Sequence, residues 1–504
     1  MLDPLDERIA SAAMSVSARL DGLRRWAPGA FVIVAGAALL RVISGVGFAN
    51  YDTLYALAWG NQLGNGETPS YGIPIAPTPH PLIELLGLVL KPLGASGAVH
   101  VTVALAFGAL AGCGWVIYRL GSLWFGRGAG VVAALVFLTR EPVLSYGVRA
   151  YIDVPYLLLV LGAVLLECRR PRRGAAVLVL LALAGLLRPE AWVFSGLYWL
   201  YLLDLLPAGV RARLPGGDDR ARTRAELARL TLLAAAAPLV WILSDFAITG
   251  HPLWSLTNTR HTATTLDRDS GIAKVPEYIP RRIGEILRPP VLVGAALGGV
   301  LSLWLLRRRA LAGAALGVLA VVVFAAFASA GLPINSRYAF LAAAVLCVFC
   351  GACVFGWSNL PADHPARRPW IAVGTLVLVA LLAFVPAQYR SAHRAFKELS
   401  NQHRIEGELL ALVHRGAINL RCGPVGVPNH APIPLLALYL NTDPANVQSA
   451  QEGHIPSGVY VDPASKEVEE DYVLDQHDPH TLVSVPPGFV ESAANHSWFI
   501  FKRC

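Results

Sequence analysis

Phe48-Ala-Asn-Tyr-Asp52-Thr-Leu-Tyr55 follows the first strongly apolar segment of the chain. It places a lone carboxylate, Asp52, close to where a membrane helix should meet water. Beyond Asp52, the residues recur with the i, i+3, i+4, i+7 spacing that is typical of one helix face. The spacing predicts a short helix that lies flat on a membrane surface. Its face consists of Tyr51, Leu54, Tyr55, Ala58, Trp59, Gln62 and Leu63.

Gly64 and Gly66 are expected to end this helix, because glycine is common where helices stop. Prolines then predict extended, turn-rich chain, since proline restricts its own backbone and that of the residue before it. These prolines are Pro69, Pro74, Pro77, Pro79 and Pro81. An acid, a surface helix and a stiff loop in this order predict a site in a groove between membrane and water.

The composition is that of a membrane protein with many spans. The chain has 504 residues, of which 55% are hydrophobic and 15% are charged, whereas soluble proteins have about 25% charged residues. We interpret the net charge of +8 as the positive-inside bias of membrane proteins. No basic patch is interleaved with aromatic residues, so membrane lipids are expected as partners and nucleic acid is not.

The apolar segments predict an α-helical polytopic protein with about eleven transmembrane helices, given about 20 residues for each full span. The predicted spans are 27–48, 96–118, 128–138, 154–168, 175–187, 191–206, 230–248, 291–306, 311–330, 338–357 and 370–386.

Every second connecting loop is rich in arginine, as the positive-inside rule demands. The N-terminal segment 1–26 is therefore expected in the cytoplasm of a bacterial cell, whose inner membrane the protein would span. The Arg-rich loops are Arg24-Arg25, Arg119…Arg127, Arg169…Arg173, Arg211…Arg229, Arg307…Arg309 and Arg367-Arg368. The opposite loops are 49–95, 139–153, 188–190, 249–290 and 331–337, and they are expected outside.

Residues 387–504 differ from the membrane part 27–386, because apolar residues become fewer and Pro, Asn, Asp and His more frequent. We expect a small extracytoplasmic α/β domain here. Its predicted elements are a helix at Arg404–Val413 and strands at Gly423–Val427, Gly458–Val461, Leu482–Val485 and Trp498–Phe501.

Seven cysteines do not predict a disulfide scaffold. Cys422 and Cys504 both fall in the outer domain, where oxidation can occur, and a bridge between them stays open. Cys347, Cys350 and Cys353 have metal-like spacing, but no His or acidic residue is close in sequence. We interpret them as small side chains of a packed helix.

Ionisable residues at the outer ends of spans are candidates for function, because such positions are costly. Asp52 either caps the surface helix or acts as a general base that takes a proton from an acceptor hydroxyl. Asp153 closes the second outer loop four residues after Arg149, and on a helix the two could pair. Alternatively, Asp153 is a second acid near Asp52, and Arg149 is a cation for a phosphate.

Arg188 and Glu190 interrupt an apolar run at the outer surface. They are either a structural ion pair or part of a substrate site, since charges this close to a bilayer need protein or a polar cavity around them. Arg281 and Arg282 break the positive-inside pattern, so they are either solvated charges or contacts for an anionic partner. His251 lies in the same loop and is a further candidate for substrate binding.

Arg337 precedes Tyr338 at the outer start of the tenth predicted span. It either snorkels to the interface or contacts a lipid-linked phosphate. His80 shares the first outer loop with Asp52, which makes it a candidate for substrate binding, together with Tyr51 and Tyr55. We find no convincing set of metal ligands.

The order of five short motifs resembles the GT-C glycosyltransferases. This group of polyprenyl-phosphate-sugar enzymes includes protein O-mannosyltransferases and the aminoarabinose transferase of lipid A. The resemblance covers about residues 27–390 and rests on the order and topology of the motifs. They are Asn50-Tyr-Asp52, Pro79-His80-Pro81-Leu82, Arg149-Ala-Tyr-Ile-Asp153-Val-Pro155, Leu187-Arg188-Pro-Glu190 and Arg337-Tyr338.

The resemblance implies the GT-C fold and a membrane enzyme. It would move a sugar from a polyprenyl-phosphate donor to an envelope glycan, lipid or protein acceptor at the outer face, usually with inversion. The resemblance gives Asp52 the role of catalytic base. Thr53 replaces the second acid of the common Asp-Glu pair, so Asp153 is the candidate second acid. Metal dependence varies in this group, and no cofactor is expected with certainty. The positions implied for the donor phosphate are Arg149, Arg337, Arg281 and Arg282.

Two other classes of function stay open. A lipid or solute transporter, such as a flippase, should have charged or broken helices near the bilayer midplane and often two related halves. The sequence reveals neither feature. A non-catalytic envelope assembly protein would use the outer domain to bind glycan. The long outer loop and the outer domain favour the enzyme.

Overall fold

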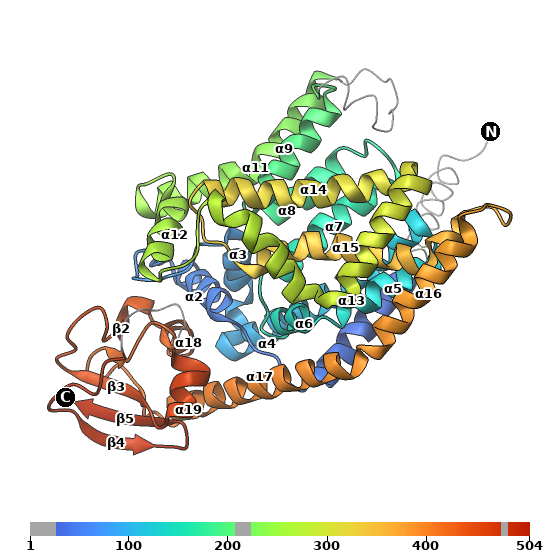
Figure 1. Cartoon of the computed structure of the whole chain (residues 1–504). Coiled ribbons are helices and arrows are strands. Elements are labelled where there is room, and N and C mark those ends of the chain that lie inside the picture. Colours follow the sequence, from blue (N-terminus) through green and yellow to red (C-terminus); the bar gives the residue numbers. More distant parts are fainter. Residues whose placement is uncertain (1–26, 207–222, 475–481) are drawn as a thin grey trace, which may run out of the picture.

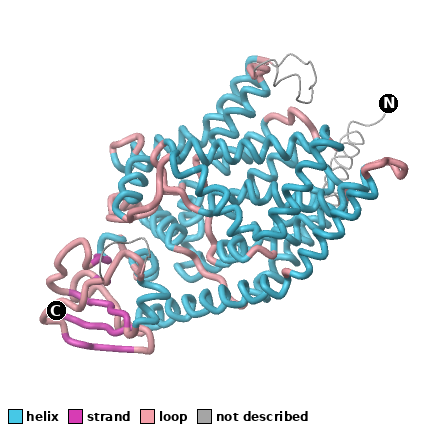
Figure 2. Tube along the Cα trace, viewed as in Figure 1, coloured by secondary structure: helices cyan, strands magenta, loops and turns pink. Residues whose placement is uncertain are grey.

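The computed structural model describes residues 27–206, 223–474 and 482–504. Helices dominate this part of the chain, and the strands gather in one small domain at the C-terminal end (Figures 1 and 2). The predicted cytoplasmic segment 1–26, with Arg24 and Arg25, lies outside the described residues. So does much of the predicted Arg-rich loop between 211 and 229.

The membrane part begins with a helix at Ala27–Ser44. The helices that follow up to the middle of the chain are α2 (Tyr51–Asn65), α3 (Pro81–Leu90), α4 (Gly94–Phe125), α5 (Arg127–Leu138), α6 (Glu141–Val148), α7 (Asp153–Arg169), α8 (Ala175–Gly185), α9 (Glu190–Leu202) and α11 (Arg224–Thr249). The later helices are α12 (Trp254–Thr265), α13 (Val275–Leu305), α14 (Arg307–Ser329), α15 (Phe340–Phe355), α16 (Arg367–Ala383) and α17 (Val385–His414).

Every predicted span coincides with a helix or with part of one. Among the described residues, six helices are long and apolar enough to cross a membrane, or up to eight if each bent pair counts as one span. The prediction of a mostly helical multi-span membrane protein is confirmed, whereas the number of eleven spans stays a prediction. The spans predicted to be short, 128–138 and 175–187, correspond to α5 and α8.

The helix predicted after Asp52 is α2, and it ends at Gly66 with φ 78°, in the left-handed region that favours glycine. Its aromatic face is covered by protein, because α3 and the C-terminal domain pack against it. The prediction of extended chain through Pro81 was wrong at its end. Pro81 is the first residue of α3, where a missing N–H costs no helical hydrogen bond.

Helices α13 and α15 lie in close contact because glycines face the partner backbone. A Cβ atom on Gly298 would overlap with the carbonyl oxygen of Phe349 in α15. Cys347, Cys350 and Cys353 are buried and free in α15, in agreement with their interpretation as packing residues.

Two spans are broken near each other, which the sequence did not reveal. In α13, Arg288 has φ 66° and ψ 159°, and Pro289 and Pro290 follow it. Helices α5 and α6 are bent by 64° at their junction. Arg140 at this junction donates to the carbonyl oxygen of Leu287 at 3.0 Å, which satisfies an acceptor that the break in α13 exposes.

The C-terminal domain contains a five-stranded sheet in the order β2-β1-β3-β5-β4. β1 is parallel to β2 and β3, whereas β5 is antiparallel to β3 and β4. The prediction of three strands is confirmed, but residues 482–485 form none, and β2 and β4 were missed. The bounds are β1 (Val425–Val427), β2 (Val447–Ser449), β3 (Gly458–Pro463), β4 (Val490–Ala494) and β5 (Trp498–Arg503).

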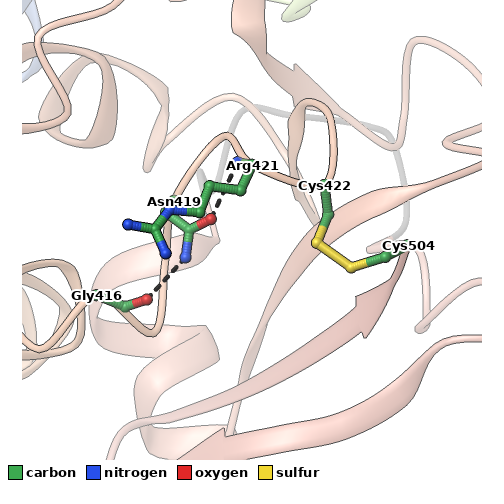
Figure 3. Close-up of a disulfide and its surroundings, with 5 residues drawn as sticks. All are labelled: Gly416, Asn419, Arg421, Cys422 and Cys504. Carbon is green, nitrogen blue, oxygen red and sulfur yellow. Dashed lines mark hydrogen bonds between the residues drawn. A yellow bond between two sulfur atoms is a disulfide. The ribbon is translucent and has the colours of Figure 1, made fainter.

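A disulfide joins Cys422 to Cys504 (Figure 3). The sequence had left open whether these two cysteines form a bridge. Cys504 follows β5 directly, and Cys422 follows a turn. In this turn Asn419 donates to the carbonyl oxygen of Gly416 and accepts from the N–H of Arg421. The bridge ties the end of the chain to the segment that enters the sheet.

Helix α17 connects the two parts of the protein and contains the predicted helix Arg404–Val413 (Figure 1). It leaves α16 at a bend of 40° and continues into the C-terminal domain. There, helix α18 (Ile433–Tyr439) packs against α2, and Tyr55 and Trp59 share one apolar core with Leu436. The domain therefore rests directly on the helix that carries Asp52.

Candidate active site

The sequence around Asn50 fixes the start of α2. The side-chain oxygen of Asn50 accepts hydrogen bonds from the backbone N–H groups of Asp52 and Thr53, at 2.8 and 3.2 Å. This is the usual arrangement at a helix N-terminus. Asp52 thus sits in the first turn, and its backbone is rigidly held by a neighbouring side chain.

The same residues attach α2 to the segment between α6 and α7. The backbone N–H of Asn50 donates to the carbonyl oxygen of Arg149 at 2.9 Å, and the Thr53 hydroxyl donates to that of Ala150, also at 2.9 Å. Ala150 has φ 48°, so the loop turns sharply before α7. These contacts bring Asp153, in the first turn of α7, close to Asp52.

Three carboxylates and two guanidinium groups from distant parts of the chain form one cluster. Arg337 Nη1 lies 2.9 Å from Asp52 Oδ2 and 3.8 Å from Asp153 Oδ2. Arg188 pairs with both Asp153 and Glu190. Asp153 is only 2% exposed, and the side chains of Asp52 and Arg337 are 16% and 17% exposed. The cluster is therefore mostly desolvated, with Asp52 at its more accessible end.

Tyrosine rings hold the two arginines in place. The guanidinium carbon of Arg188 lies 3.9 Å from the ring centre of Tyr338 and 5.6 Å from that of Tyr156. The guanidinium of Arg337 lies over Tyr151, at 5.4 Å. Such cation–π contacts strengthen where water is excluded.

The cluster opens into a cavity of about 350 Å³. Its wall is mostly apolar, with Trp241, Leu256 and Phe327 among the apolar side chains, and polar groups are interspersed between them. The charged and polar residues in its lining are Asp52, Thr78, His80, Arg188, Glu190, Asp245, Ser255, Thr259, Thr262, Arg268, Asn335, Arg337 and Tyr338. A cavity of this size and character is typical of a site for a small molecule or for the head of an amphiphile.

Asp52 and His80, which both line the cavity, have shifted pKa values. Burial by itself would raise the pKa of Asp52, but the attraction of Arg337 and, less strongly, of His80 outweighs it, so this pKa is lowered. The pKa of His80 is lowered to about 4, mainly by burial; Asp52 opposes this shift, and Arg188 and Arg337 add to it. At neutral pH the site therefore contains an ionised Asp52 and a neutral His80.

Six of the predicted site residues belong neither to this cluster nor to the lining of the cavity, and four of these six are basic. Arg149 does not pair with Asp153, because its guanidinium stacks on Tyr146 and Tyr151, at 5.2 and 5.0 Å, and bonds to Ser145. The remaining three are Arg281 and Arg282, which pair with Glu285, and His251, which is exposed and stacks on Trp254.

The predicted tyrosines of α2 lie behind Asp52. The hydroxyl of Tyr51 donates to the carbonyl oxygen of Ile75 at 3.2 Å, and its ring contacts Tyr55 and His430. Tyr51 thus joins α2 to the proline-rich loop and to the C-terminal domain, and the fully buried Tyr55 supports it.

Several polar residues at the site escaped the sequence analysis. Asp245 is 2% exposed and accepts from the N–H and hydroxyl groups of Ser255, at 2.8 and 2.7 Å. It is an acid within an apolar span, which is a recognisable signal of function. Glu84 is a comparable case in α3, where it accepts from the Tyr71 hydroxyl at 2.6 Å and from the N–H of His80 at 3.0 Å. It anchors the proline-rich loop. Among the described residues, no group of three or more His, Cys, Asp or Glu side chains could hold a metal ion.

Comparisons with known proteins agree with this architecture. No family model and no curated protein matches the chain. Among solved structures, ArnT from Cupriavidus metallidurans bound to undecaprenyl phosphate has a TM-score of 0.56 at 15% identity, with 94% of this chain and 97% of that chain covered. ArnT in the apo state has a TM-score of 0.54 at the same identity and coverage. An oligosaccharyltransferase of Archaeoglobus fulgidus has a TM-score of 0.44 at 12% identity, with 81% of this chain and 61% of that chain covered. The similarity to ArnT spans both the membrane part and the C-terminal domain, and the chain therefore has the GT-C fold that its motifs imply.

Proposed function

We propose that the protein is a membrane glycosyltransferase that moves a sugar from a polyprenyl-phosphate donor to an acceptor at the outer face of a bacterial inner membrane. The observation that carries this proposal is the ion pair of Asp52 and Arg337 at the wall of a mostly apolar cavity. A base and a phosphate-binding cation are the two groups that this reaction needs.

In the proposed reaction, the acceptor hydroxyl gives its proton to a carboxylate oxygen of Asp52. The hydroxyl oxygen forms a bond to the anomeric carbon of the sugar, on the face opposite the phosphate. The bond between this carbon and the phosphate oxygen breaks, and its electron pair stays on the phosphate. Arg337 stabilises the negative charge that develops there, and the sugar is transferred with inversion.

The structure supports Arg337 over the other candidates for the donor phosphate. Arg337 lines the cavity next to Asp52, whereas Arg281 and Arg282 are paired with Glu285 at the surface of α13. Arg149 stacks on two tyrosine rings and does not line the cavity. Arg149, Arg281 and Arg282 are therefore less favoured than Arg337 as contacts for the donor phosphate.

An apolar groove beside the site suits the lipid part of the donor. It has a volume of about 630 Å³ and is lined by α3, α4 and α7. Ile152 borders both this groove and the Asp52 cavity. We propose that the polyprenyl chain occupies the groove and that its phosphate meets Arg337. The structure of ArnT with undecaprenyl phosphate supports a carrier of this class.

The outer position of the site follows from the predicted orientation, with the N-terminus inside and the C-terminal domain outside. The acceptor is then an envelope glycan, lipid or protein that reaches Asp52 from the outer face. The transporter alternative gains two observations, since α13 is broken at Arg288 and α5 is bent by 64° against α6. However, Arg140 caps the carbonyl of Leu287 at the break in α13, and this contact gives the break a structural role.

The test is sugar transfer in membranes from cells that express the wild type, Asp52→Asn or Asp204→Asn. Radiolabelled polyprenyl-phosphate sugars serve as donors, and the host envelope supplies acceptors. Asp204 pairs with Arg172 away from the cavity and is the matched control. We expect Asp52→Asn to lower transfer by about 10²- to 10⁴-fold at normal protein levels. Transfer that is unaffected by Asp52→Asn would exclude Asp52 as the base, and no transfer from any donor would favour a transporter or a glycan-binding protein.

A further inference from the structure

We propose that Arg337 is shared between Asp52 and Asp153, and that a lipid phosphate in the cavity draws Arg337 away from Asp52 and thereby frees Asp52 to act as a base. Asp153 is then a positioning residue for Arg337, and not a second catalytic acid. This inference rests on the proposed function and describes how the same site responds when its donor binds.

Arg188 cannot be the cation that moves. It pairs with Asp153 and with Glu190, its Nε donates to Glu190 Oε2 at 3.2 Å, and its guanidinium rests on Tyr338. Its movement would leave the buried Glu190 without a counterion and would leave Asp153 with Arg337 alone, at 3.8 Å, which is strongly unfavourable. Arg188 therefore forms the fixed part of the cluster.

Arg337 makes fewer hydrogen bonds to carboxylates than Arg188 does. It makes one hydrogen bond, from Nη1 to Asp52 Oδ2 at 2.9 Å, and its buried Nε atom has no hydrogen-bond partner. Asp153 Oδ2 is also buried without a hydrogen-bond partner, and it lies 3.8 Å from Arg337 Nη1. Unsatisfied buried donors and acceptors are costly, so a small shift of Arg337 toward Asp153 gains a hydrogen bond for both.

There is space for this shift. A small cavity of about 30 Å³ lies among Asp153, Arg188, Glu190, Arg337 and Tyr338. Its lining includes the side chains of Asp153 and Arg337, which carry the two unsatisfied atoms. Because a guanidinium has five N–H donors in a planar fork, Arg337 can bond to Asp153 on one edge and to a phosphate on another.

The charges of the cluster explain why Asp52 is the group that is released. Three carboxylates share two guanidinium groups, and a phosphate adds a further anion. Asp153 and Glu190 have side chains that are 2% and 10% exposed, whereas Asp52 is 16% exposed. Asp52 therefore loses its counterion at the lowest desolvation cost, and then holds a proton more readily. The other titratable or charged groups that face it are Tyr51 and Tyr55 on α2, His80 before α3, Tyr151 before α7, Arg188 before α9 and Arg268 after α12.

The test is calorimetric titration of the full-length protein in nanodiscs with undecaprenyl phosphate. Titrations in two buffers of different ionisation enthalpy give the number of protons that binding takes up. We expect the wild type to take up more protons than Asp52→Asn. We also expect Asp52→Asn to bind undecaprenyl phosphate several-fold more tightly, because the phosphate no longer competes with a carboxylate for Arg337. Asp204→Asn should match the wild type.

Asp52→Glu retains a titratable carboxylate and should retain the proton uptake, which guards against a general effect of substitution at this position. Equal proton uptake by the wild type and Asp52→Asn, with unchanged affinity, would overturn the inference and leave the proposed donor intact. A wild-type protein of normal thermal stability that does not bind undecaprenyl phosphate would overturn the proposed donor, and the inference with it.

Discussion

Asp52 and Arg337 are 285 residues apart in the chain, and Arg337 Nη1 lies 2.9 Å from Asp52 Oδ2. Asp52 lies in the first turn of α2, and Arg337 lies just before the buried helix α15. Their contact closes the membrane part of the protein around the cavity. It also places a cation beside the proposed base, which determines how the reaction should depend on pH.

The first prediction concerns this pH dependence. Arg337 lowers the pKa of Asp52, so the free enzyme should keep its base ionised under mildly acidic conditions. In Arg337→Gln the burial of Asp52 remains and the nearby cation is lost, so the acidic limb of kcat/KM should move to higher pH by about 1 to 3 units.

The matched control for this prediction is Arg337→Lys, which keeps the positive charge. It should lower the rate, because lysine lacks the planar fork, but leave the acidic limb within about half a unit of the wild type. The measurement is initial transfer rate at low donor concentration between pH 4 and 8. Identical acidic limbs in all three proteins would show that Arg337 does not control the titration of Asp52.

The second prediction concerns His80. Its pKa is lowered to about 4 by burial, whereas the unfolded chain should titrate near the ordinary value of about 6.5. Between these values the unfolded state binds more protons, so the free energy of unfolding falls as the pH is lowered through 6.5. The contribution that is lost at pH 5 is about 2 kcal/mol.

Thermal unfolding followed by tryptophan fluorescence at pH 7.5 and 5.0 checks this prediction. The loss of stability at pH 5.0 should be smaller in His80→Gln than in the wild type, because glutamine does not titrate. The same drop in both proteins would mean that His80 is not buried in its neutral form.

The third prediction concerns Arg281 and Arg282. Both pair with Glu285, and Arg281 has a side chain that is 66% exposed. Exposed pairs of this kind contribute about 0 to 1 kcal/mol. The double change to glutamine should therefore alter the Kd for undecaprenyl phosphate by less than about fivefold, whereas Arg337→Gln should weaken binding by at least about tenfold. Both Kd values are measured by titrating undecaprenyl phosphate into the protein in nanodiscs. A larger loss of affinity in the double variant than in Arg337→Gln would support Arg281 and Arg282 as contacts for the donor phosphate.

The fourth prediction concerns the disulfide. Cys422 and Cys504 are 82 residues apart, and closing a loop of this size stabilises a domain by about 4 kcal/mol in the chain-entropy model. Changing both cysteines to serine should lower the thermal stability of the C-terminal domain. Cys168→Ser is the control, because Cys168 is a free cysteine of the membrane part. Equal stability of the double variant and the wild type would show that the bridge contributes little.

The sequence allowed much of the membrane part to be predicted, because a span leaves a long apolar signal that does not depend on its neighbours. The helix after Asp52 was also predicted, and Gly66 marks its end locally, but its N-terminal cap is Asn50 and not Asp52. The breaks at Arg140 and Arg288 were not predicted. Pro289 and Pro290 favour the break at Arg288 locally, whereas the bond from Arg140 to the carbonyl of Leu287 joins residues 147 positions apart and leaves no local signal.

In the candidate site, too, local features could be predicted and long-range contacts could not. Asp52, Asp153 and Arg337 could be selected one by one, because each is an ionisable residue at the end of an apolar segment. Their partners could not be selected, since the local spacing favours a pair of Arg149 and Asp153, whereas Asp153 pairs with Arg188. The strands β2 and β4 were missed for a related reason, because both are short edge strands with little apolar alternation.

The unbroken helix α17 has a consequence for how the protein can tolerate changes in length. One residue added within a helix turns everything beyond it by about 100° and moves it by about 1.5 Å. Such an addition between Val385 and Ile405 would rotate the C-terminal domain about the helix axis and separate α18 from α2. The angular setting of the domain over Asp52 is thus fixed by the number of residues in α17, and changes of length should be tolerated only where they add nearly whole helical turns.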